Sequence, residues 1–336
     1  MSNNCPGLVA PSWWGLRDYL ESNHFQAIPI TKLSDGGHGD TLSVKMVLPT
    51  FCQARCMFCF NRYTAETQCH EWLQFMRSMS GSLAEVFKNS GHRKISLDIT
   101  GGEPTFDPEK FTAFLDGLYK VITYCKTMTI DQALPNIDKI VLTTNGYRLD
   151  EMLEKPEFLR TVDIVNISMH HYDYLRRQEI FGTKIIPSNG DIYRINYKLH
   201  KHHKKATAVA VVYAGEFNGV EFNGFVRKFA HEALNLGFDD VRIRLDYMDT
   251  GHNEDLFDVE FPQESIFETD ALKVKTIQGL ELPVNIYKGV PDISQYVVGP
   301  EMIIDDNGLL YLDYIKEKPI MPEEIRMLAE NVYVRN

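Results

Sequence analysis

The chain has 336 residues, of which 44% are hydrophobic and 24% charged, and its formal net charge is -11 at pH 7. No apolar stretch approaches the roughly 20 residues that a membrane helix needs. The acidic balance argues against a nucleic-acid partner, because phosphate backbones bind clustered Lys and Arg. We therefore expect a cytoplasmic protein with neither a membrane nor a nucleic-acid partner.

Short apolar, β-branched runs alternate with helical stretches along most of the chain. Such runs predict buried parallel strands joined by crossover helices. The predicted strands are 44–48, 94–100, 139–144, 162–168, 206–213 and 241–246. The predicted helices are 69–88, 108–124, 150–158, 191–202 and 222–236, the last of them ending before Gly237. Six strand–helix units predict an α/β fold, namely a partial (β/α)6 TIM-like barrel.

The barrel is expected to occupy residues 44–250. Residues 1–43 would form an N-terminal extension, and residues 251–336 a C-terminal extension that covers the substrate side. Within the C-terminal extension, apolar runs flank the turn sequence Asp306-Asn307-Gly308. This arrangement predicts a β-hairpin.

Three cysteines lie close together directly after the first predicted strand. Cys52, Cys56 and Cys59 have the spacing C-x3-C-x2-C. Iron–sulfur clusters bind thiolates, normally one per iron of a four-iron cube, so three ligands leave one iron open. An open coordination position is typical of catalytic metal sites, whereas a closed four-ligand shell is usually structural. The loop is therefore expected to hold a cluster that takes part in chemistry.

Zinc binding and disulfide formation are the alternative uses of these thiols. Cys69 and His70 follow ten residues or so after Cys59, so a zinc site with one of them as fourth ligand is chemically possible. A disulfide framework is disfavoured, because three clustered cysteines are an odd set. Outside the cluster motif, Cys5, Cys69 and Cys125 are scattered and do not form the clustered set that a second iron–sulfur cluster requires.

A second motif stands at the end of the second predicted strand, where Gly101, Gly102, Glu103 and Pro104 follow an apolar run. This motif and the cysteine spacing, with Phe58 just before the third cysteine, resemble the two signatures of the radical S-adenosylmethionine (radical SAM) superfamily. The resemblance implies a 4Fe-4S cluster on the three cysteines, whose open iron binds S-adenosylmethionine. It also implies reductive cleavage of that cofactor to a 5′-deoxyadenosyl radical, which abstracts hydrogen from a substrate, and an electron donor such as flavodoxin or ferredoxin.

Residues just past the barrel strands are further candidates, because catalytic groups of such barrels lie there. The resemblance implies that the Gly101 to Pro104 motif meets the methionyl amino group of the cofactor. It also implies a polar contact to the cofactor ribose after the fourth strand, where Ser168 is the preferred residue and His170 the next. Asn145, after the third strand, is interpreted as a turn residue.

The fifth and sixth strands give less specific signals. Val209, Val211, Tyr213 and Glu216 occupy the offsets of the Gly-x-Ile-x-Gly-x-x-Glu pattern that lines the adenine in relatives. Both glycines are missing, so Glu216 is either a cofactor contact or a turn cap. On the sixth strand, Arg242, Arg244 and Asp246 share one face. In the barrel lumen these guanidiniums would bind a carboxylate or phosphate, with Arg244 nearest the active end; on the outer face they would be surface charges.

The resemblance and the remaining cysteines imply a single-cluster enzyme without the SPASM auxiliary clusters. The expected substrate is a small polar metabolite such as a nucleoside, nucleotide or sugar derivative, with the reaction after hydrogen abstraction left open. Two alternatives stay open from the sequence. One is a radical SAM modifier of a ribosomal peptide or protein, and the other is a non-catalytic iron–sulfur or zinc-binding protein.

Overall fold

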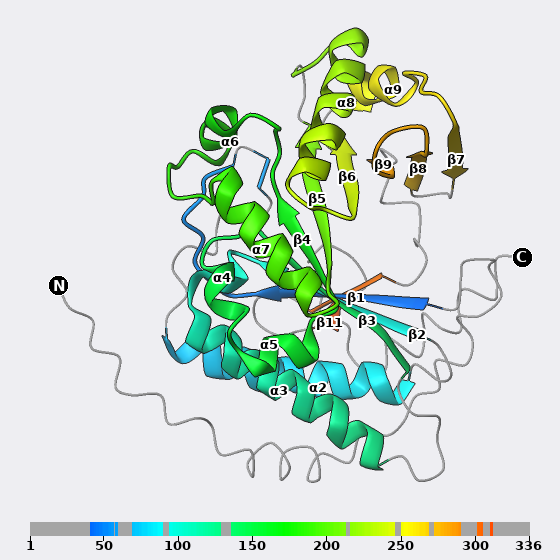
Figure 1. The fold of residues 1–336 in the computed structure, drawn as a ribbon. Helices are drawn as coiled ribbons and strands as arrows, with labels where there is room; N and C mark the ends of the chain where they lie inside the picture. The colour runs from blue at the N-terminus through cyan, green and yellow to red at the C-terminus, as the bar shows by residue number, and fades with distance from the viewer. Residues whose placement is uncertain are drawn as a thin grey trace, which may run out of the picture. The chain divides into compact units, whose positions relative to one another are not determined.

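The computed structural model describes residues 41–56, 58–59, 69–89, 94–128, 136–212, 216–245, 250–268, 272–289, 301–304 and 310–311. These residues form two compact units. The first holds the described residues up to 51, together with 69–140 and 301–311, and the second holds 52–59 and 141–289. Strand β3 (Asn136–Thr144) begins in the first unit and ends in the second. Figure 1 shows the elements in chain order.

The first unit is a short sheet with two long helices. Strand β1 (Thr41–Leu48) lies parallel to β2 (Lys94–Gly101) and, on its other side, to β10 (Glu301–Ile304). The chain passes from β1 to β2 through α2 (Cys69–Asn89), and from β2 through the 3-10 turn η1 (Pro104–Phe106) and α3 (Pro108–Met128) to β3. Trp72 and Phe75 of α2 pack against Phe114 of α3, and all three are buried. This aromatic contact joins the two helices.

The second unit continues the alternation of strands and helices. Its parallel strands are the end of β3, β4 (Ile164–Ser168), β5 (Lys205–Val212), β6 (Asp240–Leu245) and β9 (Val284–Gly289). Two antiparallel strands, β8 (Leu272–Ile277) and β7 (Glu264–Glu268), extend the sheet beyond β9. The helices are α4 (Leu149–Met152), α5 (Pro156–Thr161), α6 (Tyr174–Phe181), α7 (Asn189–Lys201), α8 (Gly219–Asn235) and α9 (Thr250–Phe257).

Parallel strands that alternate with helices confirm the predicted α/β fold, an open sheet of the partial-barrel type. The hairpin is confirmed as well, since β11 (Leu310–Tyr311) pairs antiparallel with β10. The single helix predicted at 150–158 is wrong, because α4 ends at Met152 and α5 begins at Pro156. Proline suits the first turn of a new helix and holds the preceding residue, Lys155, in an extended conformation. Among the described residues, none of the helices combines the length and apolar character needed to cross a membrane.

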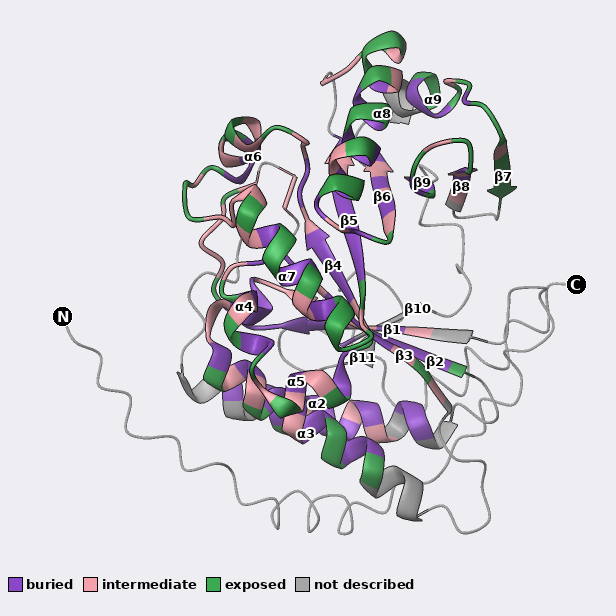
Figure 2. Ribbon diagram, viewed as in Figure 1, coloured by how far each residue is buried: buried purple, intermediate pink, exposed green. Residues whose placement is uncertain are grey.

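The sheet of the second unit has one apolar and one polar face. The apolar face is at most 1% exposed and consists of Val165, Ile167, Ala206, Ala208, Ala210, Val212, Val241, Ile243, Leu245, Val284 and Ile286. Helix α7 contacts β5 and α8 contacts β6, and α8 buries an apolar side that includes Phe222, Val226 and Phe229. The helices therefore cover the apolar face, whose buried residues are purple along β4 and β5 in Figure 2. The polar face lies on the side away from these helices.

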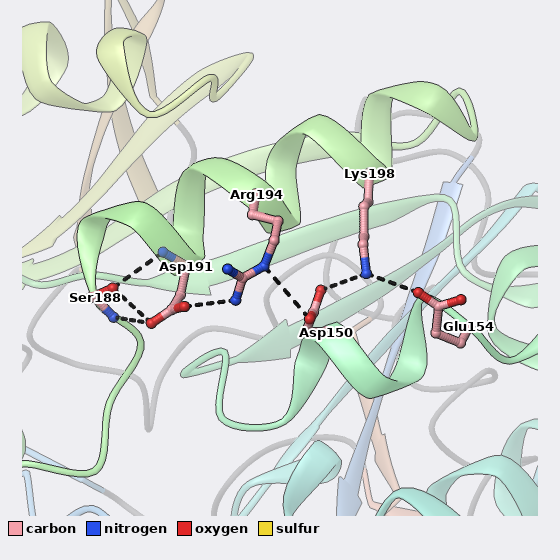
Figure 3. Close-up of polar contacts among 6 residues, drawn as sticks. All are labelled: Asp150, Glu154, Ser188, Asp191, Arg194 and Lys198. Carbon is pink, nitrogen blue, oxygen red and sulfur yellow. Dashed lines mark hydrogen bonds and ion pairs between the residues drawn. The ribbon is translucent and has the colours of Figure 1, made fainter.

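Polar contacts fix helix α7 at both of its ends (Figure 3). At its start, a capping box joins the backbone N–H of Ser188 and Asp191 to each other's side chains. Near its end, Lys198 Nζ lies 2.9 Å from Asp150 Oδ1 and 2.8 Å from Glu154 Oε1. These bonds raise the pKa of Lys198. Exposed ion pairs stabilise a fold little, so their main consequence is to set the position of α7 against α4.

Candidate active site

The three predicted cluster ligands lie in a loop that begins the second unit. Cys52, Cys56 and Cys59 are not joined in disulfides and are of intermediate exposure. The backbone N–H of Arg55 donates to the carbonyl of Phe181 at the end of α6 (2.8 Å), and that of Cys59 donates to the carbonyl of Cys56 (3.2 Å). The loop is therefore held against α6 while its thiols remain partly accessible.

The electrostatics of the loop suit a cationic group. Burial, followed by the neighbouring Cys59 and Cys52, raises the pKa of Cys56 to about 12. Three adjacent thiolates repel one another, and bound iron removes that cost because coordination deprotonates a thiol outright. In the described part of the chain, no three His, Cys, Asp or Glu side chains converge on a single metal ion. A four-iron cluster does not require such convergence, since each thiolate binds a different iron, and the donor set fits that group.

Asn145 contacts this loop from the end of β3. Its Oδ1 accepts from the backbone N–H of Tyr147 (3.0 Å), as a turn residue would. Its Nδ2 also donates to Cys52 Sγ (3.7 Å). The turn contact was predicted, and the cysteine contact was missed. The only signal for it in the sequence is that an amide side chain follows a strand of the same sheet.

His170 supports the loop from the end of β4. It is 5% exposed and adopts a left-handed conformation with φ 61°. Its Nδ1 accepts from the backbone N–H of Val211 (3.1 Å), so the imidazole replaces a backbone acceptor for β5 where β4 has ended. The ring also packs edge-on against Phe58, with centroids 4.7 Å apart, and against Phe181 at 4.9 Å. In this position His170 holds the aromatic residue that precedes Cys59.

This environment gives a pH prediction. Burial lowers the pKa of His170 from 6.5 to about 3, and Nδ1 can accept only when the ring is neutral. Below pH 6.5, His170 is therefore protonated in the unfolded chain but stays neutral in the folded chain. The free energy of unfolding thus falls as the pH falls from 6.5 toward 3. Between pH 7.5 and 5.5 this group should cost about 1.4 kcal/mol of unfolding free energy.

His170→Asn is the matched variant for denaturant unfolding at both pH values. Asn tolerates the left-handed conformation, its Oδ1 can accept from Val211, and it does not titrate. The variant should lose about 1.4 kcal/mol less than the wild type over this pH range. An identical loss of unfolding free energy in both proteins would show that folding does not keep His170 neutral at pH 5.5.

The Gly-Gly-Glu-Pro motif lies in the first unit, at the end of β2. The backbone N–H of Gly102 donates to the carbonyl of Leu48 (3.4 Å), and that of Glu103 to the carbonyl of Phe51 (3.0 Å). A Cβ on Gly101 would overlap the backbone of Leu48, and one on Gly102 would overlap the carbonyl of Thr50. These glycines therefore allow β2 to approach the segment that leads into Cys52.

Glu103 and Thr50 place buried polar groups beside this motif. The Glu103 side chain is 1% exposed, and its Oε1 accepts from the N–H (3.0 Å) and hydroxyl (2.5 Å) of Thr105. It thereby caps the turn that begins at Pro104. Thr50 Oγ1 is buried without a hydrogen-bond partner among the described residues. A buried carboxylate and an unsatisfied hydroxyl are groups that a cationic, hydrogen-bonding ligand such as an ammonium can satisfy.

The polar face of the second unit gathers several predicted candidates. It consists of Thr143, Asn166, Ser168, Thr207, Val209, Val211, Asp240, Arg242, Arg244, Asn285 and Tyr287. Ser168, Val209, Arg242 and Asn285 stand in one cross-strand row, and Val211, Arg244 and Tyr287 in the next. The two arginines are therefore on the side away from the helices, with Arg244 nearer the carboxyl ends of the strands.

Three atoms on the polar face are buried without a hydrogen-bond partner among the described residues: Asn166 Oδ1, Asp240 Oδ1 and Arg242 Nε. Asn166 is 2% exposed, and its Nδ2 donates to Thr143 Oγ1 (3.3 Å). Leaving a buried polar group unsatisfied is costly. The two acceptors, Asn166 Oδ1 and Asp240 Oδ1, suit a bound molecule that carries N–H or O–H groups, and the guanidinium donor of Arg242 suits an anionic group on it.

Glu216 is half-buried and lies two residues before Asn218, the N-cap of α8. This position is compatible with either a cofactor contact or a turn cap, so the predicted cofactor contact of Glu216 stays a prediction. Tyr213 of the same pattern and Asp246 of the sixth strand lie outside the described residues.

Repeated strand–helix units with a three-thiol loop directly after the first strand define an iron–sulfur enzyme of the partial-barrel class. Residues 46–218, just over half of the chain, match the family model described as "Radical SAM superfamily". The chain therefore belongs to the radical SAM superfamily. Its cofactors are those of the family, S-adenosylmethionine and a 4Fe-4S cluster, as predicted.

Several curated proteins are similar to this chain. The GTP 3′,8-cyclase of Haemophilus ducreyi is 27% identical over 241 residues, which cover 69% of this chain and 63% of that protein. That of Aeromonas hydrophila is 26% identical over 236 residues, covering 69% and 61%. That of Pseudomonas savastanoi is 30% identical over 154 residues, covering 45% and 38%. The matches thus span less than two thirds of the length of these relatives.

Solved structures with a similar fold include Streptococcus suis SuiB bound to S-adenosylmethionine. It is 14% identical with a TM-score of 0.46, and the match covers 95% of this chain and 69% of that chain. A second is anSMEcpe with bound AdoMet, 16% identical with a TM-score of 0.42, covering 61% and 51%. Likenesses at this level add nothing to what the sheet and the family match show.

Proposed function

We propose that this enzyme cleaves S-adenosylmethionine at a cluster held by Cys52, Cys56 and Cys59 and abstracts hydrogen from a small anionic metabolite, a nucleotide or a close derivative. Cys52, Cys56 and Cys59 would hold three irons of the cluster and leave the fourth without a protein ligand, open to the cofactor. When bound, the cluster supplies the single electron that splits the cofactor into methionine and a 5′-deoxyadenosyl radical. The electron would come from a flavodoxin or ferredoxin in the cytoplasm.

The proposal assigns the cofactor-side roles to the residues predicted for them. The Gly101 to Pro104 motif would face the methionyl amino group, and the buried Glu103 carboxylate supports this because an ammonium is a suitable partner for it. Ser168 would hydrogen-bond the ribose. His170 would act through Phe58, against which it packs, because its Nδ1 is already used by Val211.

The observation that carries the substrate class is the polar face of the second unit. Arg242 and Arg244 place two guanidiniums on it, and such groups bind phosphate or carboxylate as forks. The unsatisfied Oδ1 of Asn166 favours a substrate that also donates an N–H or O–H. The similar proteins named GTP 3′,8-cyclase support a nucleotide as the substrate. The proposal extends to the nucleotide class and names neither the base nor the product.

The segment after residue 250 also contributes to this face. Strand β9 lies beside β6 and adds Asn285 and Tyr287 in register with Arg242 and Arg244. This pairing supports the proposal that the C-terminal extension, predicted at 251–336, helps to cover the substrate side of a barrel at 44–250.

A substrate panel tests this function. Anaerobically reconstituted protein, reduced with dithionite, is given S-adenosylmethionine with GTP, ATP, guanosine, a sugar nucleotide or a synthetic peptide, and 5′-deoxyadenosine is measured over time. At least one phosphorylated nucleotide should accelerate its formation tenfold or more, while guanosine, which lacks the anionic group, should do so far less. Acceleration by the peptide alone would favour a peptide-modifying enzyme and overturn the nucleotide class.

A further inference from the structure

We propose that Asn145 sets the reduction potential of the cluster through an N–H···S hydrogen bond to Cys52. The inference rests on the proposed function, because it needs a cluster with Cys52 among its ligands. Asn145 would be a positioning residue, since it would act on the cluster through Cys52, one of the proposed ligands.

The orientation of the Asn145 amide follows from its hydrogen bonds. Asn145 is buried, with an exposed fraction of 8% for the whole residue. Oδ1 accepts from two donors, the backbone N–H of Tyr147 (3.0 Å) and Nε2 of Gln53 (3.1 Å). Both contacts require the oxygen, so the NH2 group must take the opposite position. There Nδ2 lies 3.7 Å from Cys52 Sγ.

The neighbouring contacts hold this amide in place. Gln53 directly follows Cys52, and its Nε2 is also 3.3 Å from the carbonyl oxygen of Ile185. The backbone N–H of Gly146 donates to Thr144 Oγ1 (2.9 Å), which fixes the turn after β3. The donor to Cys52 is therefore positioned by the protein itself, before any cluster binds.

The Sγ atom of Cys52 stands for the thiolate that would bind iron. Hydrogen bonds to the ligand sulfurs are one of the factors that set the potentials of iron–sulfur clusters. Reduction adds one electron, here from a flavodoxin-class donor, and makes the sulfurs more negative. A donor that faces one of them stabilises the reduced state more than the oxidised state, and burial strengthens the effect. Asn145 should thus make the cluster easier to reduce.

The test is a redox titration of the reconstituted protein, followed by electron paramagnetic resonance. Asn145→Asp keeps the shape and the acceptor for Tyr147 and Gln53, but it replaces the donor with a negative oxygen. Its midpoint potential should shift clearly to more negative values. Asn145→Ala, which removes the donor without adding charge, should shift it less in the same direction. Gln53→Ala loosens the same network but keeps the donor, so it should leave the potential near that of the wild type.

Two results would overturn the inference. One is a wild-type potential in Asn145→Ala or Asn145→Asp with full iron content. The other is an equal shift in Gln53→Ala, which would mean that loosening of the loop alone moves the potential. If Asn145→Asp fails to bind iron, the midpoint potential of Asn145→Ala alone tests the inference. Failure of the proposed function looks different, because the wild type itself would then bind no cluster or release no 5′-deoxyadenosine.

Discussion

Replacing Cys52, Cys56 and Cys59 together by Ala is expected to remove all bound iron and all cleavage of S-adenosylmethionine. The reason is chemical, because the three thiolates are the proposed iron ligands and alanine offers no donor. The measurement is iron and sulfide content with 5′-deoxyadenosine formation in anaerobically reconstituted protein. Circular dichroism should show that the α/β fold is kept, since all three side chains are partly exposed.

Cys69→Ala is the matched control, because it removes one thiol at the start of α2. It should keep the iron content and the cleavage rate of the wild type. Loss of all bound metal in Cys69→Ala would make this residue a fourth ligand. The open iron on which the proposed chemistry depends would then not exist.

Arg244→Ala is expected to keep the cluster and slow, uncoupled cleavage of S-adenosylmethionine but to lose the acceleration by nucleotide. Its guanidinium lies on the polar face, on the side away from α7 and α8. A hydrogen bond to a charged group contributes about 1.5–3 kcal/mol. Removing it should weaken nucleotide binding roughly 10- to 100-fold, and misplacement of the substrate would reduce the rate further.

The matched control is Arg227→Ala, which removes an exposed arginine of α8 that bonds Asn223 (2.7 Å). GTP-dependent 5′-deoxyadenosine formation should stay at the wild-type level in this variant. Ser168→Ala should instead weaken binding of S-adenosylmethionine, so Ser168 and Arg244 variants should fail at different steps. Full nucleotide acceleration in Arg244→Ala would exclude this arginine from substrate binding.

The fold was largely predictable because its signals are local. The apolar runs at 94–100 and 241–246 correspond to β2 and β6 within one residue at each end, since a buried parallel strand must be apolar on the side that faces its helix. Gly237, with φ 82°, follows the end of α8, as predicted. Strands β7 to β9 were missed. β7 is mostly exposed, and neighbouring strands rather than an apolar run define it.

The candidate site was predictable only where its residues are close in sequence. Cysteine spacing and the Gly-Gly-Glu-Pro motif are local patterns, and they led to the family. The contact of Asn145 with Cys52 joins residues 93 positions apart, and that of His170 with Val211 joins residues 41 apart. A single sequence contains no pattern that pairs such positions. The role of Asn145 therefore emerged only from the folded chain.

The most direct test of the account is the yield of 5′-deoxyadenosine from fully reconstituted, reduced protein given S-adenosylmethionine alone. We predict that 5′-deoxyadenosine and methionine form in equal amounts, only when reductant is present, and not at all in the triple cysteine variant. Prolonged incubation of iron-loaded, fully reduced wild-type protein without any 5′-deoxyadenosine would contradict the assignment of Cys52, Cys56 and Cys59 to a catalytic cluster.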